Sequence, residues 1–258
     1  MASRLSFFLW SSLPDDELLA LAGSEDLRDP EVLEQQVLRM LADPKAAAFI
    51  DNFGGQWLYL RNLDGIYPDP AEFPEFDENL REAFKRETQL FIDHQIRNDN
   101  SLRELLSADY TFVNERLARH YGIPGIYGNR YRKVTLDGAE RGGLFGHGSL
   151  MMVTSYPNRT SPVLRGKFVL ENLLGGPPPE PPPNVPALET SSDGKQLTMR
   201  DAMAMHRENP ACRVCHAAMD PIGFSLENYD AVGKWRNVFA DQPIDASGLL
   251  PDGNTFDG

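Results

Sequence analysis

Apolar side chains recur every three or four positions along most of the chain, which is the spacing that places them on one face of an α-helix. The longest such segment covers residues 77–97. Its apolar face is formed by Leu80, Phe84, Phe91 and Ile92, and Arg81, Lys85, Arg86 and Glu87 lie mostly on the other face. This pattern predicts one long amphipathic helix.

Helix-start residues precede most of the other periodic segments. Aspartate or serine followed by proline opens three of them, at Asp29, Asp43 and Ser161, and Thr198 caps a fourth. Gly54 lies inside one of these helices and indicates a close approach by another helix. The helices expected besides 77–97 cover residues 1–10, 14–22, 29–41, 43–60, 101–106, 114–121, 161–174, 198–207, 210–220 and 224–232, whereas only residues 131–136 predict a strand.

These elements predict a mainly α-helical protein. We expect a helical domain over residues 1–137 that packs on a C-terminal helical region over residues 138–258. Residues 175–186 contain seven prolines, so we expect a polyproline strap that leads into the last helices. The glycine-rich stretch 142–150 fits no phosphate-binding spacing, and we interpret it as a tight loop with close backbone packing.

The charge of the chain limits its partners. With 25 Lys and Arg against 38 Asp and Glu, the 258 residues carry a net charge of −13. Phosphates would repel such a chain, so we expect no nucleic-acid partner. No apolar run is long enough to cross a bilayer, so we expect no membrane span. The apolar start of the chain resembles a short signal peptide, but the acidic residues 15–17 indicate a helix start instead, and no signal peptide is evident.

Both cysteines of the chain fall in one pentad, Cys212-Arg213-Val214-Cys215-His216. This C-x-x-C-H pattern is typical of c-type haem attachment. Two thiols one helical turn apart can each bind a vinyl group at one edge of the porphyrin, and the next residue then directs its imidazole at the iron. We therefore expect one covalent haem c, anchored by Cys212 and Cys215, with His216 as the proximal iron ligand.

Three alternatives without haem remain for the pentad. A redox dithiol of the thioredoxin type usually follows a strand and opens a helix, and no such strand precedes residue 212. A zinc site would take Cys212 and Cys215 with His206 and His216, crowding four ligands into one short segment. The two cysteines can also stand without any cofactor.

The second iron ligand must come from upstream of the pentad or be absent. Met203 and Met199 share one helix face with His206, and Met203 is our first candidate as the second metal ligand. Met151, Met152 and His147 are weaker candidates. Two protein ligands would give electron transfer, whereas an open site would permit peroxidase-like oxidoreductase chemistry.

The residues after the pentad are expected to surround the haem. The turn at residues 220–223 is well placed to offer a backbone carbonyl to the second ring nitrogen of His216. The aromatic and aliphatic side chains that would form the apolar wall are Phe224, Leu226, Tyr229 and Trp235. Glu227 and Asp230 are interpreted as surface carboxylates rather than proton donors.

Two groups of motifs resemble adjacent domains of unknown function in large, modular cytochrome-c-like proteins that are abundant in planctomycetes. The first group is residues 3–12 with residues 14–18, and the second is residues 160–167, the end of the strap at residues 183–186, and residues 212–236. The resemblance covers nearly the whole chain, and the pentad with residues 219–224 is its most specific part. It implies haem c and a redox role, without naming a substrate.

Together these observations predict a c-type haem electron-transfer module within a larger redox protein. Its partners would be a redox partner protein or neighbouring haem modules. The alternatives are an open-site haem oxidoreductase and a haem-free helical interaction module. Because haem of this type is attached outside the bacterial cytoplasm, we expect a periplasmic or otherwise exported protein, of which this chain is a fragment or a processed product.

Overall fold

The structure is a computed structural model that describes residues 1–138, 140–179, 188, 191–192, 195–206, 210–250 and 253–258. It confirms a mainly α-helical chain. The α-helices are α1 (Ala2–Trp10), α2 (Asp16–Gly23), α3 (Pro30–Ala42), α4 (Ala47–Phe49), α5 (Gly55–Trp57), α6 (Glu78–Arg97), α7 (Glu104–Ser107), α8 (Glu115–Tyr121), α9 (Gly148–Val153), α10 (Pro162–Phe168), α11 (Met199–His206) and α12 (Pro210–Phe224). Two π-helical segments, η3 (Ile50–Gly54) and η6 (Val169–Leu173), extend α4 and α10.

The strands that the structure describes are short and form four antiparallel pairs. They are β1 (Tyr110–Val113) with β2 (Arg132–Thr135), β3 (Ser191–Ser192) with β4 (Lys195–Gln196), β5 (Val238–Phe239) with β6 (Gln242–Pro243), and β7 (Ser247–Leu249) with β8 (Thr255–Asp257). The strand expected at residues 131–136 is therefore confirmed as β2. Its partner β1 and the hairpins β5–β6 and β7–β8 show too little alternation of apolar and polar side chains to be predicted from the sequence.

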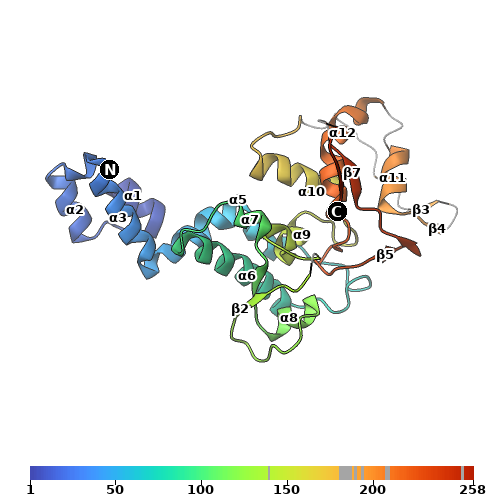
Figure 1. The fold of residues 1–258 in the computed structure, drawn as a ribbon, viewed down its shortest axis with the longest axis horizontal. Helices are drawn as coiled ribbons and strands as arrows, with labels where there is room; N and C mark the ends of the chain where they lie inside the picture. The colour runs from blue at the N-terminus through green and yellow to red at the C-terminus, as the bar shows by residue number, and fades with distance from the viewer. Residues whose placement is uncertain (139, 180–187, 189–190, 193–194, 207–209, 251–252) are drawn as a thin grey trace.

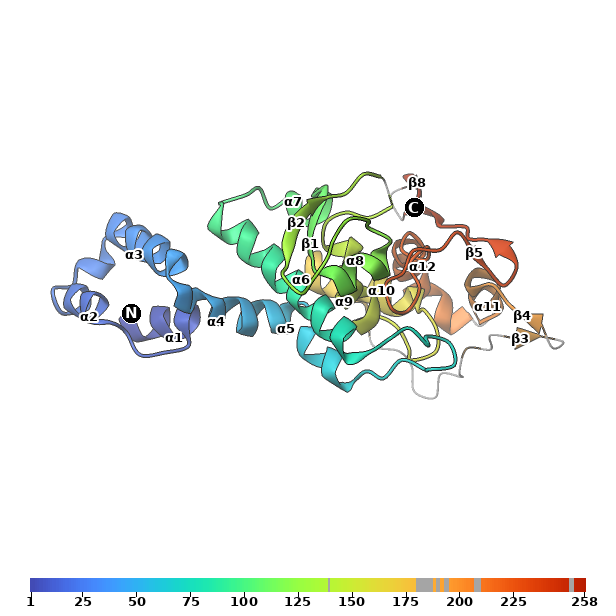
Figure 2. The ribbon, with the colours of Figure 1, turned by 90° about the horizontal axis from the view of Figure 1, so that it is seen from below.

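Helices α1, α2 and α3 form a bundle at one end of an elongated molecule, joined to the main body through α4 and α5 (Figure 2). The bundle has its own apolar cluster, made of Ala2, Leu9, Trp10, Leu18, Leu27 and Met40. The indole nitrogen of Trp10 donates to the carbonyl of Met40 at 2.9 Å and ties α1 to α3. The apolar start of the chain is thus part of a folded core, as the helix prediction required.

The helix that leads out of the bundle passes close to α6. A Cβ atom on Gly54 would lie 3.2 Å from Cδ1 of Ile92, so the glycine leaves room for that helix. This confirms the close approach that the sequence predicted at Gly54. The ring of Phe49 stacks on the ring of Phe53 at 5.0 Å, on a helix surface where Phe53 is partly exposed.

Most of the buried apolar side chains form one main core, which takes residues from both halves of the chain. Its members are Ile50, Leu58, Leu60, Leu63, Leu80, Ala83, Phe84, Phe91, Ile92, Ala108, Tyr110, Val113, Leu117, Ala118, Leu144, Leu150, Met151, Met152, Phe168, Leu226 and Tyr229. Hydrogen bonds also join the two halves of the chain. Trp57 Nε1 donates to the carbonyl of Asn172 at 2.7 Å, and His120 Nε2 bonds to the carbonyl of Val232 at 2.8 Å. A domain boundary near residue 137 stays a prediction, since a shared core joins the two sides.

Helix α6 has the predicted length but a different set of buried residues. Its cap is the carboxylate of Asp77, which accepts from the Leu80 amide at 2.7 Å. The sequence places Arg81 and Glu87 opposite the apolar face, yet both side chains are buried. The reason is that other segments cover α6 on more than one side: the Arg81 guanidinium donates to the carbonyl of Ile66 at 2.6 Å, and Glu87 lies among β1, α8 and the loop before α9.

The glycine-rich stretch forms the tight loop that the sequence predicted. Gly143 has a φ of +49°, and a Cβ atom there would overlap the backbone of Leu106. A Cβ atom on Gly148 would overlap the ring of Phe84. These glycines let the loop and the first turn of α9 lie directly against α6 and α7, which is a packing role.

Candidate functional site

Helix α12 carries the C-x-x-C-H pentad in its first two turns and continues to Phe224. The prediction that Asp220-Pro221 ends this helix is wrong, because Pro221 lies inside it. A proline inside a helix removes one backbone hydrogen bond, and packing against the neighbouring helix α10 stabilises α12 in spite of that loss. On a continuous helix, residues 212, 215 and 216 lie on one face.

Helices α10 and α12 run antiparallel and cross at two glycines. A Cβ atom on Gly223 would overlap the carbonyl oxygen of Pro162, and one on Gly166 would overlap the carbonyl oxygen of Met219. The backbones therefore touch directly, next to the turn that follows the pentad. Figure 1 shows α10 and α12 beside β7, at the end of the molecule far from the N-terminus.

The segment after α12 is a series of turns rather than the expected helix over residues 224–232. Arg165 of α10 is fully buried beneath it, and its guanidinium donates to the carbonyls of Leu226 at 2.5 Å, Tyr229 at 2.9 Å and Asp230 at 2.8 Å. In a helix, most of these carbonyls would accept hydrogen bonds from backbone amides and would not be available to Arg165. The arginine therefore stabilises the turns rather than a helix. Burial lowers the pKa of Arg165 to about 10, which leaves it charged at neutral pH.

Glu227 belongs to the same buried network, which corrects its interpretation as a surface carboxylate. Its side chain is buried, and it accepts from the Thr160 hydroxyl at 2.6 Å and from the Arg236 guanidinium at 2.7 Å. Arg165 lies 3.8 Å from its other oxygen. Thr160, Arg165, Glu227 and Arg236 all fall within the motifs that carry the family resemblance, and here their role is to hold the turns after α12.

His216 is the one member of the pentad whose side chain the structure describes. Its Nδ1 atom lies 2.9 Å from Oδ1 of Asp220, one turn further along α12. Asp220 is 0% exposed and the His216 side chain 13%. The expected partner was a backbone carbonyl from residues 220–223. It is instead the Asp220 carboxylate, because α12 continues and the i, i+4 spacing brings the two side chains together.

Several predicted site features lie outside the described residues. They include the side chains of Cys212, Cys215 and His206 and most of the polyproline strap, residues 180–186. The donor set is nevertheless consistent with a covalent haem. One helix carries both thiols and the imidazole, and an iron bound to His216 would take Nε2 while Asp220 binds Nδ1.

Met203, the first candidate for a second ligand, is buried on α11. It is 1% exposed and forms a small apolar cluster with Met199 and Phe224, at the end of α12 that follows the pentad. Arg200 fixes α11 there, because its guanidinium lies 4.3 Å from the ring of Phe224 and 3.0 Å from the carboxylate of Asp245. The assignment of Met203 as an iron ligand stays a prediction.

The weaker candidates lie in the main core. Met151 and Met152 are buried within it. His147 has its Nδ1 2.9 Å from the hydroxyl of Thr88, and burial lowers its pKa to about 3. Of the residues expected to form an apolar wall, Leu226 and Tyr229 are also main-core members and Trp235 packs against them, whereas Phe224 contacts the α11 methionines.

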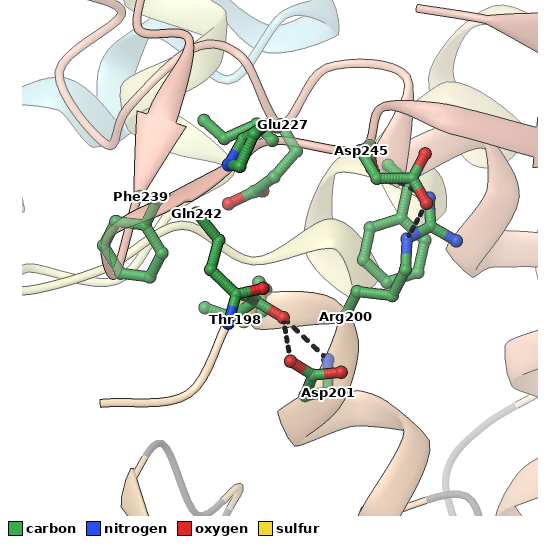
Figure 3. Close-up of a pocket in the computed structure, with 11 residues that line it drawn as sticks. Thr198, Arg200, Asp201, Glu227, Phe239, Gln242 and Asp245 are labelled. Carbon is green, nitrogen blue, oxygen red and sulfur yellow. Dashed lines mark hydrogen bonds and ion pairs between the residues drawn. The ribbon is translucent and has the colours of Figure 1, made fainter. Parts of the chain in front are cut away.

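Two small cavities lined by described residues adjoin the end of α12. One, of about 220 Å³, lies between α11 and the β5–β6 hairpin (Figure 3). There, Thr198 is hydrogen-bonded to Asp201 and Arg200 is paired with Asp245, while Glu227 and Gln242 extend from the other side. The other, of about 250 Å³, lies between α12 and β7 beside Asp220. Pockets for drug-sized ligands measure roughly 300–1,000 Å³, so neither cavity accommodates a porphyrin.

Within the described part of the chain, no group of three or more His, Cys, Asp and Glu side chains is placed to hold a metal ion. The zinc alternative depends on both cysteines, so it lies outside the described side chains. Among the described helices, none has the length and apolar character needed to cross a membrane.

Sequence reasoning missed three features of this site: the Asp220 carboxylate, the Arg165 network and the glycine pair at the α10–α12 crossing. A signal for Asp220 was present, because it stands four residues after His216 on the same helix. No local signal marks Arg165, whose carbonyl partners lie 61 to 65 residues away.

Comparison with known protein families divides the chain into two parts. Residues 1–123 match PSD4, described as a protein of unknown function (DUF1592), and residues 141–238 match PSCyt3, described as a protein of unknown function (DUF1588). The second match contains α10, α12 and the pentad. No curated protein and no solved structure matches the chain. The chain therefore carries two adjacent domains of unknown function, DUF1592 followed by DUF1588, as the resemblance predicted.

Proposed function

We propose that residues 141–238 bind one covalent c-type haem and that the protein is an electron-transfer module of a larger exported redox protein. Cys212 and Cys215 would hold the porphyrin through thioethers, and His216 would bind the iron. When bound, the haem supplies a one-electron Fe(III)/Fe(II) couple. The chain's own part is to anchor the group, orient the imidazole and shield one side of the site.

The observation that carries this proposal is the pair formed by His216 and Asp220 on α12. A metal-binding histidine commonly has its other ring nitrogen hydrogen-bonded to a carboxylate or carbonyl, which fixes the ring. Here Asp220 Oδ1 lies 2.9 Å from Nδ1 of His216. The same part of α12 packs closely against α10 at Gly166 and Gly223. The name PSCyt3 of the second matched family also hints at a cytochrome-like domain.

Attachment can be tested directly. The chain is exported in bacteria together with haem-maturation proteins, and the purified protein is examined by pyridine haemochrome spectroscopy and by intact mass. We expect one haem per chain with the spectrum of two thioether bonds. The variants Cys212→Ala and Cys215→Ala should each give a spectrum of a single thioether bond or no haem.

A matched pair of histidine variants separates ligation from general damage to the fold. His216→Ala should abolish low-spin iron, whereas His94→Ala, on the distant helix α6, should leave the spectrum unchanged. Colourless wild-type protein of unmodified mass would refute the proposal and leave a helical scaffold of another function.

The burial of Met203 favours a second candidate, a haem whose sixth position is open. Met203 is packed against Met199 and Phe224, so binding iron would require it to leave that cluster. A sulfur-to-iron charge-transfer band that disappears in Met203→Ala, but persists in Met199→Ala, would support the electron-transfer module. High-spin iron that binds cyanide rapidly would support the open-site oxidoreductase instead.

A further inference from the structure

We propose that Asp220 is a positioning residue that lowers the reduction potential of the iron bound by His216, because it offers the imidazole a buried carboxylate in place of a carbonyl. This inference deepens the proposed function and depends on it. Asp220 lies outside the pentad, and the inference follows from its contact with His216 on the same helix, α12.

The geometry of the contact is well defined. Oδ1 of Asp220 lies 2.9 Å from Nδ1 of His216, and the aspartate is 0% exposed. Both residues stand on the same helix, and Met219 and Gly223 on either side of Asp220 touch the backbone of α10. The helix crossing therefore fixes the backbone on both sides of Asp220.

A carboxylate acts on the imidazole differently from a carbonyl. It holds the proton on Nδ1, so that Nε2 is the nitrogen with the lone pair, and its negative charge makes that nitrogen a stronger donor. Because Asp220 is buried, water and salt screen its charge much less than at the surface. The Fe(III) state carries one more positive charge than Fe(II), so the carboxylate stabilises the ferric state.

The electron transfer itself stays a simple step. With haem bound, a redox partner protein would supply the one electron that converts Fe(III) to Fe(II). His216 would hold the iron in both states, and the proton shared between Nδ1 and Asp220 would stay in place. Asp220 would change only the equilibrium constant of this transfer. Its effect should exceed that of a carbonyl, because a hydrogen bond to a charged group is about twice as strong as one to a neutral group.

The test compares the wild type with Asp220→Asn, which keeps the hydrogen bond to Nδ1 through the amide oxygen and removes the charge. Both proteins are loaded with haem by co-expressed maturation proteins, and their midpoint potentials are measured by spectroelectrochemistry. We expect the ferric-to-ferrous equilibrium to shift at least tenfold towards Fe(II) in the variant, which corresponds to a rise of about 59 mV.

Asp241→Asn is the matched control, since it removes the same charge from an exposed turn between β5 and β6. It should leave the potential at the wild-type value. An Asp220→Asn protein that carries haem but has the potential of Asp241→Asn would overturn the inference and leave the proposed function standing. A wild type without haem would instead refute the proposed function, which separates the two failures.

A measurement on the haem-free chain keeps the inference testable if Asp220→Asn does not fold. Nitrogen-15 NMR of histidine-labelled wild type, at a pH where the imidazole is neutral, reports which ring nitrogen of His216 carries the proton. We expect the proton on Nδ1, held by Asp220. A His216 protonated on Nε2 would overturn the inference, because Asp220 would then not orient the ring for iron.

Discussion

Replacing Glu87 with glutamine removes a carboxyl group that is buried where the two halves of the chain meet. The side chain is 0% exposed and accepts from the hydroxyls of Thr111 and Tyr121, each at 2.6 Å. Tyr121 in turn accepts from the amide of Gly148 at 2.7 Å, and the Arg141 guanidinium lies 3.6 Å from its ring centre. Burial raises the pKa of Glu87 to about 7, against an ordinary value of 4.5.

The sign of the effect follows from proton binding. Between pH 4.5 and about 7 the folded chain holds a proton on Glu87 that the unfolded chain has lost. Stability from this group is therefore complete below pH 4.5 and is lost as the pH rises through about 7. At about 1.4 kcal/mol for each pKa unit, the loss amounts to about 3 kcal/mol.

Glutamine has the same shape and no charge at any pH, so Glu87→Gln should remove this dependence. The free energy of unfolding is measured in urea, by the fluorescence of Trp57 and Trp235 beside the main core, across a series of pH values. We expect the free energy of unfolding of the variant, minus that of the wild type, to rise by about 3 kcal/mol from acidic to mildly alkaline pH. Subtracting the two curves cancels the titration of the other carboxylates.

Glu82→Gln, an exposed change on the same helix, serves as the control and should give a difference that does not vary with pH. The same flat difference for Glu87→Gln would contradict the reasoning, because it would mean that Glu87 is ionised in the folded chain at every pH tested.

The remaining predictions concern the support of α12. Gly223→Ala should destabilise the protein by about 3 kcal/mol or more, since its Cβ would overlap the Pro162 carbonyl, whereas Gly176→Ala, in open space, should have little effect in urea unfolding. Arg165→Met should cost about 3–5 kcal/mol in the same assay, because it leaves Glu227 and several buried carbonyls without that donor. The exposed change Arg130→Met is its control, and equal losses for the two arginines would contradict the proposed network.

Local patterns in the sequence were sufficient for most of the helices. The cap Asp77 and the repeat after it specify α6, and Asn114 and Gly122 bracket α8 within the predicted range 114–121, with a φ of +74° at the glycine. Capping hydrogen bonds and the 3.6-residue repeat act over a few residues, so they can be identified from the sequence.

Patterns of polarity were a weaker guide to burial. Glu87 was expected opposite the apolar face of α6, and Glu227 was expected in solvent, yet both are buried. Each is held by partners distant along the chain, Thr111 and Tyr121 for the first and Thr160 for the second. A charged residue can be buried when such partners satisfy it, and no local signal reports them.

The sequence by itself determined the helical class, most helix starts, and the pentad that predicts haem attachment. Only the tertiary structure decided that α12 continues through Pro221, that Arg165 shapes the turns after it, and that Asp220 is the partner of His216. The physical reason is that the first set depends on interactions within a few residues. The second depends on α10 packing against α12 through Gly166 and Gly223, whose contact partners Met219 and Pro162 lie 53 and 61 residues away along the chain.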